Sequence, residues 1–197
     1  MLLACKKCRR EGEKLSLKGE RCLSTKCAMN KRPYAPGDHG QGFHGKMSEY
    51  GKQLREKQKA KKIYNISESH LRKYATEAER IPGIKTENIM RLIETRIDNV
   101  VYRLGFAVSR SSARQMVSHG GFKVNGQRVT ISSYQLKIAD VITPMRPARF
   151  KDLSLNPSIT WLEADTKKLS GKVKHFPVRD EIDTPVNENL IIEFYSR

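Results

Sequence analysis

All four cysteines of this chain lie in one short segment near its start, at a spacing that suits a metal site. Two residues separate Cys5 from Cys8, four separate Cys22 from Cys27, and thirteen lie between the pairs. Each close pair can present two thiolates on one side, and the loop can fold the second pair onto the first, as in a tetrahedral zinc centre. Four thiolates also suit an iron–sulfur cluster, which remains the alternative to zinc. Because four ligands leave no position for water, we expect a structural metal.

The residues around these cysteines are strongly basic. Residues 5–27 contain eight Lys or Arg and three Glu. The positive charges favour thiolates and offset the double negative charge of a four-thiolate zinc centre. So polar a segment cannot build a core of its own, and metal binding must supply its folding free energy. We therefore expect the metal to hold a basic surface in shape.

Net charge is the dominant feature of the whole composition. The 197 residues include 38 Lys or Arg against 21 Asp or Glu, a net charge of +17, and only 38% are hydrophobic. Residues 1–62 alone carry 17 basic and 6 acidic side chains, a net +11. Such a charge favours an anionic partner, nucleic acid above all. No apolar run is long enough for a membrane span or a signal peptide, so we expect an intracellular protein with reduced thiols.

The elements that must position these groups begin with a basic helix. Helix-forming residues follow Ser48, and Lys52, Arg55, Lys59 and Lys62 fall along one stripe at helical spacing, which suits contact with a phosphate backbone. Before this helix, residues 30–46 are rich in Gly and Pro and predict an extended loop. After it, apolar spacing predicts a second helix that ends before Pro82.

The strongest periodicity in the chain predicts one long helix over residues 86–104, which Gly105 ends. A short helix with Ser109 as its N-cap follows and runs to Gly120. The Asn-Gly pair within FKVNGQRVTI at 122–131 then predicts a β-hairpin. Further strands are expected at 140–143, 159–163 and 171–173.

The predicted order of helix, Arg-bearing helix, Gly-Gly, strand, Asn-Gly and strand resembles the RNA-binding module of the bacterial uS4 family of small-subunit ribosomal proteins. The resemblance covers nearly the whole chain in the same order. Its motifs are KGERC at 18–22, KRPYAPGDHG at 31–40, EYGKQLREKQK at 49–59, RLIETRIDNVVYRLGFAVSR at 91–110, VSHGGFKVNGQRV at 117–129 and NENLIIEFYSR at 187–197.

The resemblance implies an α+β fold in three parts. These are a metal-bound basic extension at 1–45, a small helical domain at 46–89 that residues 176–197 complete, and an inserted α-α-β RNA-binding module with a small, mostly antiparallel sheet at 90–175. This sequence departs from the family pattern between Arg149 and Trp161, where the expected helix is shortened to FKDLSLNPSIT. Members without the four cysteines exist, so the zinc-binding form is a variant of the family.

The resemblance also implies a function. Members are structural constituents of the small ribosomal subunit that bind its ribosomal RNA at a helical junction, nucleate assembly of the subunit body and contribute to translational accuracy. The implied partners are small-subunit ribosomal RNA, neighbouring ribosomal proteins including uS5, and messenger RNA near the channel through which it enters. The implied location is the ribosome of the cytoplasm or of an organelle. The residues expected to contact RNA are Lys31, Arg32, Tyr34, His39, Lys52, Arg55, Lys59, Lys62, Arg110, Ser111, Arg114, His119, Lys123 and Arg128.

Two other classes compete with this interpretation. The same module is attached to RNA-modifying enzymes, and Arg96-Ile97-Asp98 is similar to the catalytic Arg-Leu-Asp of pseudouridine synthases. That motif here falls inside the predicted long helix, where we expect Asp98 on the helix surface or in capping, and the chain leaves no room for a catalytic domain. The second competitor is a DNA-binding regulator built on a zinc ribbon, but no dimer helix is evident. We therefore expect no enzyme activity.

Overall fold

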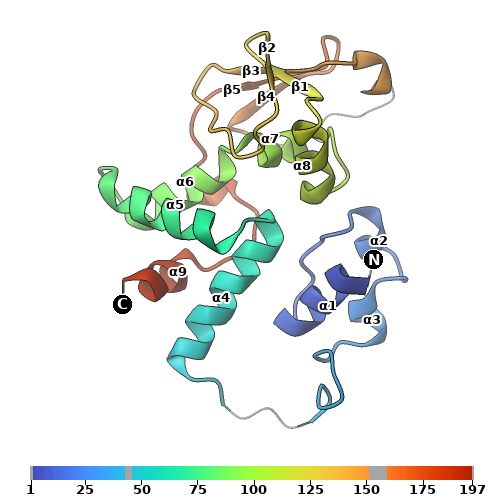
Figure 1. Ribbon diagram of the computed structural model, residues 1–197, viewed down its shortest axis with the longest axis vertical. Coiled ribbons are helices and arrows are strands. Elements are labelled where there is room, and N and C mark those ends of the chain that lie inside the picture. The colour runs from blue at the N-terminus through green and yellow to red at the C-terminus, as the bar shows by residue number, and fades with distance from the viewer. Residues whose placement is uncertain (1, 43–45, 151–158, 197) are drawn as a thin grey trace. The chain divides into compact units, whose positions relative to one another are not determined.

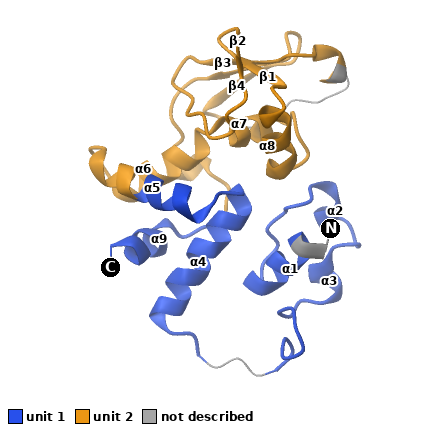
Figure 2. Cartoon of the chain, in the orientation of Figure 1, with its two compact units in different colours: residues 1–75, 185–197 blue, residues 76–184 orange. Residues whose placement is uncertain are grey.

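The computed structural model describes residues 2–42, 46–150 and 159–196, and the chain folds into two compact units. Unit 1 comprises residues 1–75 and 185–197, and unit 2 comprises residues 76–184 (Figure 2). The C-terminus thus returns to the unit in which the chain began. None of the helices in the described ranges is long and apolar enough to cross a membrane.

Unit 1 is helical (Figure 1). Its helices are α1 (Leu2–Glu11), α2 (Glu20–Leu23), α3 (Ala28–Lys31), α4 (Glu49–Tyr64), the first part of α5 (Glu68–Arg80) and α9 (Glu188–Tyr195). The basic helix begins as predicted, because the Ser48 side chain accepts a hydrogen bond from the Gly51 amide. It ends at Asn65, which takes a left-handed conformation with φ 54°.

The C-terminal helix α9 packs on α4 through mixed polar and aromatic contacts. Gln53 Nε2 donates to Glu193 Oε2 at 3.0 Å, and the ammonium of Lys57 lies 3.9 Å from the ring centroid of Phe194. Tyr195 Oη donates to Glu68 Oε1 at 2.8 Å. These contacts tie the C-terminal segment to the helices at the centre of unit 1.

Unit 2 contains the rest of α5, three more helices and a sheet. The helices are α6 (Lys85–Glu94), α7 (Ile97–Arg103) and α8 (Arg110–Ser118). The strands are β1 (Phe122–Val124), β2 (Gln127–Val129), β3 (Val141–Pro144), β4 (Leu162–Asp165) and β5 (Ser170–Val173), with 3-10 turns at Pro147–Phe150 and Arg179–Glu181. Neighbouring strands of this sheet pair antiparallel, in the order β2-β1-β3-β5-β4, which confirms the predicted small antiparallel sheet.

The prediction of one continuous helix over 86–104 is wrong, because the chain breaks between α6 and α7. Arg96 has extended backbone angles (φ −64°, ψ 138°) and forms a β-bridge with Gln135. The Ile97 amide donates to Tyr134 O at 2.9 Å, and the Leu136 amide donates to Thr95 O at 3.0 Å. This distant pairing overrides the local helical preference, while the apolar periodicity continues on both sides of the break.

The hairpin prediction is confirmed at Asn125-Gly126. Both turn residues have positive φ, 49° and 83°, as a tight two-residue turn between twisted strands requires. Lys123 pairs with Arg128 across the ladder, so both side chains stand on one face of the hairpin. The Asn125 side chain also bonds the start of β3, accepting from the Val141 amide and donating to Asp140 Oδ1.

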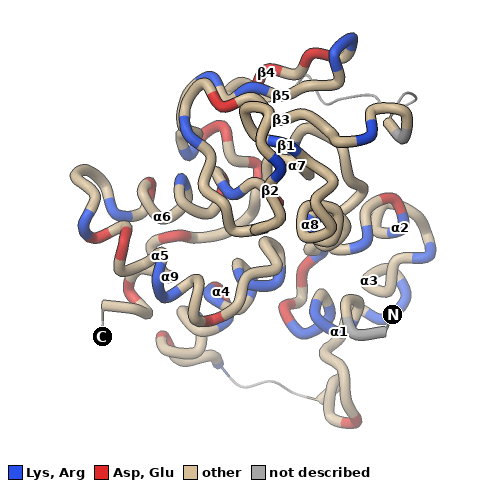
Figure 3. The backbone as a smooth tube through the Cα atoms, turned by 45° about the horizontal axis from the view of Figure 1, so that its top comes forward, with Lys and Arg blue, Asp and Glu red and all other residues tan. Residues whose placement is uncertain are grey.

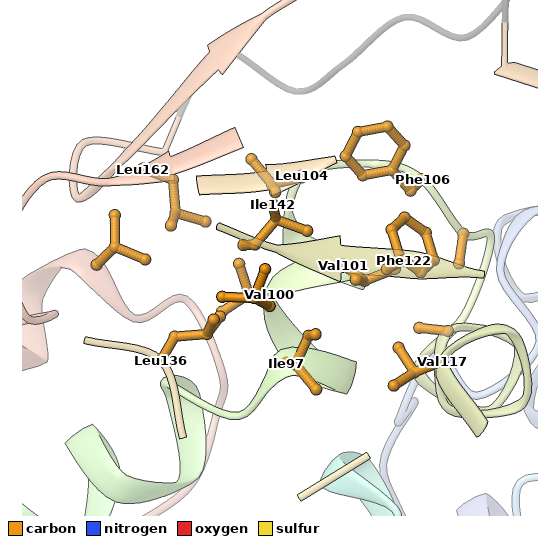
Figure 4. Packing of buried hydrophobic residues seen from close by; sticks show 14 of the residues in the cluster. Ile97, Val100, Val101, Leu104, Phe106, Val117, Phe122, Leu136, Ile142 and Leu162 are labelled. Atoms are coloured by element: carbon orange, nitrogen blue, oxygen red, sulfur yellow. The ribbon is translucent and has the colours of Figure 1, made fainter. Parts of the chain in front are cut away.

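The core of unit 2 is a cluster of buried apolar side chains (Figure 4). Helix α7 and the residue after it contribute Val100, Val101 and Leu104, each 0% exposed, and the sheet contributes Phe122 and Ile142. The module of α7, α8 and the five strands, hereafter the sheet module, is therefore held by hydrophobic burial.

The observed units place two boundaries differently from the expected domains. Residues 76–89 lie with the sheet module instead of with the helical domain, and the returning segment begins at Pro185 instead of at residue 176. Asn88 explains part of the first difference, because its side-chain amide donates to Ile81 O at 3.0 Å and ties the end of α5 to α6. Most of the unusual segment between Arg149 and Trp161 lies outside the described residues.

Candidate nucleic-acid interface

The four cysteines come together in the structure. Cys5, Cys8, Cys22 and Cys27 line one small cavity in unit 1, and all four are free thiols. The helices α1 and α2 carry the first three, and Cys27 lies directly before α3. The Lys18 amide donates to Cys22 Sγ at 3.3 Å, a contact that suits a thiolate.

Burial acts on the Cys8 thiol against the thiolate form. Burial raises the pKa of Cys8, and the nearby sulfurs of Cys22, Cys5 and Cys27 raise it further, against a lowering backbone hydrogen bond at Leu15. The surrounding Lys and Arg therefore do not dominate at this thiol. In the described part of the chain, no group of three or more Cys, His, Asp or Glu is already arranged to hold a metal ion. Zinc at these cysteines stays a prediction, supported by the convergence of all four thiols.

The loop after α3 is tied back to the cysteine helices. Arg9 Nε donates to Tyr34 O at 2.8 Å, Arg9 Nη2 donates to Ala35 O at 3.2 Å, and the guanidinium lies 4.9 Å from the Tyr34 ring centroid. Tyr34 is consequently half-buried under Arg9. Lys31, Arg32 and His39 are exposed, as RNA contact requires.

The four predicted cations of α4, which we call the α4 stripe, are all ion-paired. Lys52 Nζ lies 2.6 Å from Glu49 Oε1 in an exposed pair. Lys62 pairs with Glu11, and Arg55 Nη1 lies 3.4 Å from the same carboxylate. The tube in Figure 3 marks Lys and Arg positions along α4 in blue, and the acidic Glu11 of the N-terminal segment already neutralises part of this charge.

Lys59 is the most enclosed member of the α4 stripe. Its ammonium lies 2.9 Å from Glu56 Oε1 and 3.3 Å from Glu13 Oε2. Burial lowers the pKa of Lys59, but hydrogen bonds and attraction from Glu56 and Glu13 outweigh burial and leave the pKa raised. The residue is buried, so phosphate contact there requires Glu13 to move aside. RNA contact by the α4 stripe stays a prediction.

The sheet module gathers part of its predicted patch. Arg128 Nη2 donates to His119 O at 3.2 Å, and Lys123 faces Arg128 across the hairpin. Ser111 is exposed near the start of α8 and Arg114 is half-buried one turn after Arg110. The structure therefore brings His119, Lys123 and Arg128 to the hairpin side of α8.

Arg110 has a structural role that its spacing did not reveal. Its Nε donates to Asn99 Oδ1 at 2.8 Å, and its guanidinium lies 4.5 Å from the Tyr102 ring centroid. Asn99 Nδ2 in turn donates to the fully buried Glu94 at 2.6 Å. Replacing Arg110 therefore disturbs packing as well as any RNA contact.

The same buried carboxylate anchors the end of unit 2. Arg103 donates to Glu94 at 2.7 and 3.0 Å, to Thr184 Oγ1 at 3.2 Å, and to Asp183. Burial raises the pKa of Asp183, but the bond from Arg103 outweighs it and leaves the pKa lowered. A continuous polar network thus runs from Arg110 to the residues at which the chain leaves unit 2.

The Arg96-Ile97-Asp98 motif, which is similar to the catalytic motif of pseudouridine synthases, is buried. Arg96 Nε and Nη2 donate to the two carboxylate oxygens of Asp98 at 2.9 and 2.6 Å, and the two residues are 1% and 3% exposed. Of the two roles expected for Asp98, the position on the helix surface is wrong, because Asp98 is buried, and in place of a side-chain cap it forms a bidentate pair with the N-cap residue Arg96 in the first turn of α7. This geometry braces the break between α6 and α7.

Two family models match adjoining parts of the chain. Residues 4–94 match the ribosomal protein S4/S9 N-terminal domain, and residues 95–142 match the S4 domain. The boundary between the two matches falls at the break between α6 and α7, where the sheet module begins.

Curated relatives match over nearly the full length. The small ribosomal subunit protein uS4 of Natranaerobius thermophilus is 51% identical over 98% of this chain and 96% of its own. Protein uS4A of Clostridium novyi is 53% identical over the same shares, and uS4 of Acetivibrio thermocellus is 51% identical over 98% and 97%. The chain belongs to the uS4 family of small ribosomal subunit proteins.

Proposed function

We propose that the protein is a structural constituent of the small ribosomal subunit that binds small-subunit ribosomal RNA directly, at a junction of helices. The observation that carries this proposal is the collinear similarity to uS4 proteins over 98% of the chain. The net charge of +17 supports it, because a primary RNA binder must neutralise many phosphates. The proposed work of the protein is recognition and scaffolding, without catalysis.

Binding is distributed over three basic surfaces. These are the exposed residues at 31–39, the α4 stripe, and the hairpin side of α8 in the sheet module. Each surface alone offers a few phosphate contacts, and joining them in one chain raises the effective concentration of each on the same RNA. A junction, where several RNA strands meet, lets one protein engage three surfaces together.

The proposal includes a structural zinc in the extension. Cys5, Cys8, Cys22 and Cys27 would hold it, because they line one cavity and four thiols match the donor set of structural zinc. The bound ion would cross-link α1, α2 and the start of α3. The alternative is an iron–sulfur cluster, and metal analysis of the purified protein would distinguish it from zinc.

The wider role follows the family. We propose that the protein joins the subunit early, nucleates assembly of its body, contacts uS5 and messenger RNA near the channel through which it enters, and contributes to translational accuracy. Its place is then the cytoplasmic ribosome.

Binding to a junction of small-subunit ribosomal RNA, measured against duplex DNA at matched salt, tests the proposal. With about six to ten phosphates neutralised, affinity should fall by about 10³ to 10⁵ between 50 and 200 mM salt. Replacing Lys31 and Arg32 by Gln should reduce the salt slope by about two. Lys167 and Lys168 are exposed at the β4–β5 turn, and replacing both by Gln should leave the salt slope unchanged. A preference for DNA would overturn the proposal in favour of a DNA-binding regulator.

A further inference from the structure

A hollow in unit 2 lies beside the predicted RNA-binding patch and contains residues that the patch did not include. It lies between α8, the Gly-Gly turn, the hairpin and the segment after β3. Its lining residues are Gln115, Met116, His119, Gly120, Gly121, Arg128, Met145, Arg146 and Phe150. We refer to this cavity as the α8 hollow.

The walls of the hollow are fixed by one glycine. The Gly121 amide donates to Met116 O at 2.9 Å, and Gly121 O accepts from the Met145 amide at 2.8 Å. The backbones of the two methionines are therefore bonded to the same glycine. A Cβ at Gly121 would lie 2.9 Å from Met116 O, so the close approach needs glycine.

Gly120 positions the first cation of the hollow. Its φ of 71° favours glycine, and a Cβ there would lie 2.1 Å from Arg128 Nε. The Arg128 guanidinium thus lies directly over Gly120, where it also donates to His119 O. Arg146 supplies a second exposed cation to the lining.

The aromatic part of the lining is also held in place. Phe150 meets Phe106 edge to face, with centroids 5.5 Å apart, and lies 6.1 Å from Phe122. Phe106 and Phe122 belong to the core of the sheet module. Phe150 therefore extends the rigid core to a surface that is only partly covered.

The chemistry of the lining selects a ligand with two parts. Two arginines and no Asp or Glu among the described lining residues favour an anion, and guanidinium groups bind phosphate well. Met116, Met145 and Phe150 offer apolar and polarisable contacts that suit a flat aromatic group. The Gln115 amide can both donate to and accept from the edge of such a ring. Phosphate and base together describe one nucleotide.

We propose that the α8 hollow receives a single unstacked nucleotide of the bound RNA, with its base against Met116, Met145 and Phe150 and its phosphate on Arg128 and Arg146. This inference rests on the proposed binding of ribosomal RNA and adds to it a site for one residue of that RNA. Bases splayed out of a folded RNA are the usual targets of direct recognition by proteins. Helical junctions supply such bases where strands change partners.

Methyl NMR of full-length protein labelled at its methionines tests the hollow without ribosomal RNA. Adenosine or uridine monophosphate should shift the methyl signals of Met116 and Met145, while Met29, Met47 and Met90 serve as internal controls that stay fixed. Inorganic phosphate, which can occupy only the arginine part of the hollow, should shift the Met116 and Met145 signals clearly less than either nucleotide does. Equal shifts with phosphate, or no shift with any nucleotide, would overturn the site for a base.

Binding of the junction RNA tests whether the occupant belongs to that RNA. Gln115→Trp places a large ring at the rim of the hollow and should weaken binding about 5- to 150-fold, the range for losing one stacked base. Ser118→Trp is the matched control, because Ser118 is exposed on α8 but does not line the hollow. Gln115→Glu, matched by Ser118→Glu, repeats the test with a smaller side chain that repels phosphate.

The outcomes separate this inference from the proposed function. If the Gln115 variants bind like wild type, or if Gln115 and Ser118 variants weaken binding equally, the nucleotide site is overturned while ribosomal RNA binding stands. If wild type shows no preference for the junction, the proposed function fails together with the RNA source of the nucleotide. If a nucleoside monophosphate still shifted the methyl signals of Met116 and Met145, the α8 hollow would be a site for a free nucleotide.

Discussion

The cysteine segment, residues 2–31, and the sheet module differ in what holds each of them. In the cysteine segment the described buried side chains are few, and its links to α4 are ion pairs from Glu11 and Glu13. The sheet module encloses a continuous cluster in which Val100, Leu104 and Phe122 are 0% exposed. The observed links of the first region to α4 include ion pairs, whereas the second region is held by apolar burial.

The difference lies in which groups make the internal contacts of each region and which groups are left for the proposed RNA contacts. Apolar burial is insensitive to the screening of charges, so the sheet module presents its cations on a scaffold that moderate salt does not alter. The cysteine segment and α4 use the same kind of group, the charged side chain, both for internal contacts and for the proposed RNA contacts. Internal contacts and proposed RNA contacts therefore share every cation of the α4 stripe in unit 1, whereas in the sheet module the apolar core is separate from the proposed contacts and Arg110 serves both.

Removing the proposed metal should produce the largest contrast. A chelator, or Cys22→Ser, should abolish amide protection across the cysteine segment, because structural zinc contributes about 10 to 16 kcal/mol of apparent binding free energy to such folds. Hydrogen exchange should show residues 97–145 unchanged. Thr25→Ser, an exposed neighbour, is the control. Full protection after both treatments would mean that the segment folds without metal.

Opening the apolar core should affect the other region. Phe122→Ala should lower the free energy of unfolding of the sheet module by about 3 to 5 kcal/mol, because it leaves a cavity beside Phe106. Ile131→Ala, at a site 63% exposed, should change it by less than about 0.5 kcal/mol. Denaturant unfolding followed by Trp161 fluorescence measures both. Similar values for the two variants would contradict the assignment of stability to apolar burial.

Neutralising Glu11 and Glu13 tests the coupling in unit 1. The double change to Gln should loosen the cysteine segment from α4 by about 3 to 5 kcal/mol, mostly through Glu11, because that side chain is 2% exposed and its loss leaves the charge of Lys62 uncompensated. High salt should weaken only the contribution of the half-exposed Glu13, by about 1 kcal/mol at most. The same variant should bind junction RNA more tightly, because Lys62 and Lys59 lose internal partners. Glu20→Gln combined with Glu163→Gln, two exposed positions, controls for the same change of two charges. Weaker RNA binding by the double variant alone would argue against phosphate contact by the α4 stripe.

The smallest expected effect is a pH dependence at Glu68. Burial raises the pKa of this carboxyl, but hydrogen bonds from Lys61, Lys57 and Tyr195 outweigh burial and lower it from 4.5 to about 2. Because the folded pKa is depressed, the stabilisation is complete above pH 4.5 and is lost as the pH falls toward about 2. Protection of α9 should decline over this window in wild type, and Glu68→Gln should remove that component. An identical decline in the variant would assign it to other carboxylates.

Local patterns in the sequence predicted much of this protein correctly. The Asn125-Gly126 pair defined a hairpin, the run of helix formers after Ser48 marked where α4 begins, and the predicted N-cap Ser109 marked where α8 begins. The spacing of the cysteines predicted that four thiols would converge, and they line one cavity. These features depend on residues close together in the chain, where turn geometry and capping act directly.

Contacts between distant residues decided the rest. The periodicity predicted one continuous helix, but Arg96 pairs with Gln135 and the helix is interrupted there. Asp98 accepts two hydrogen bonds from Arg96 and lies buried. The sequence by itself determined a basic, cysteine-bearing chain with an α+β module, because composition and local spacing are properties of neighbouring residues. Only the tertiary structure decided which cations are already paired and that the α8 hollow exists. Both depend on backbone groups and side chains that lie tens of residues apart in the chain, as Lys59 does from Glu13 and Met145 does from Gly121.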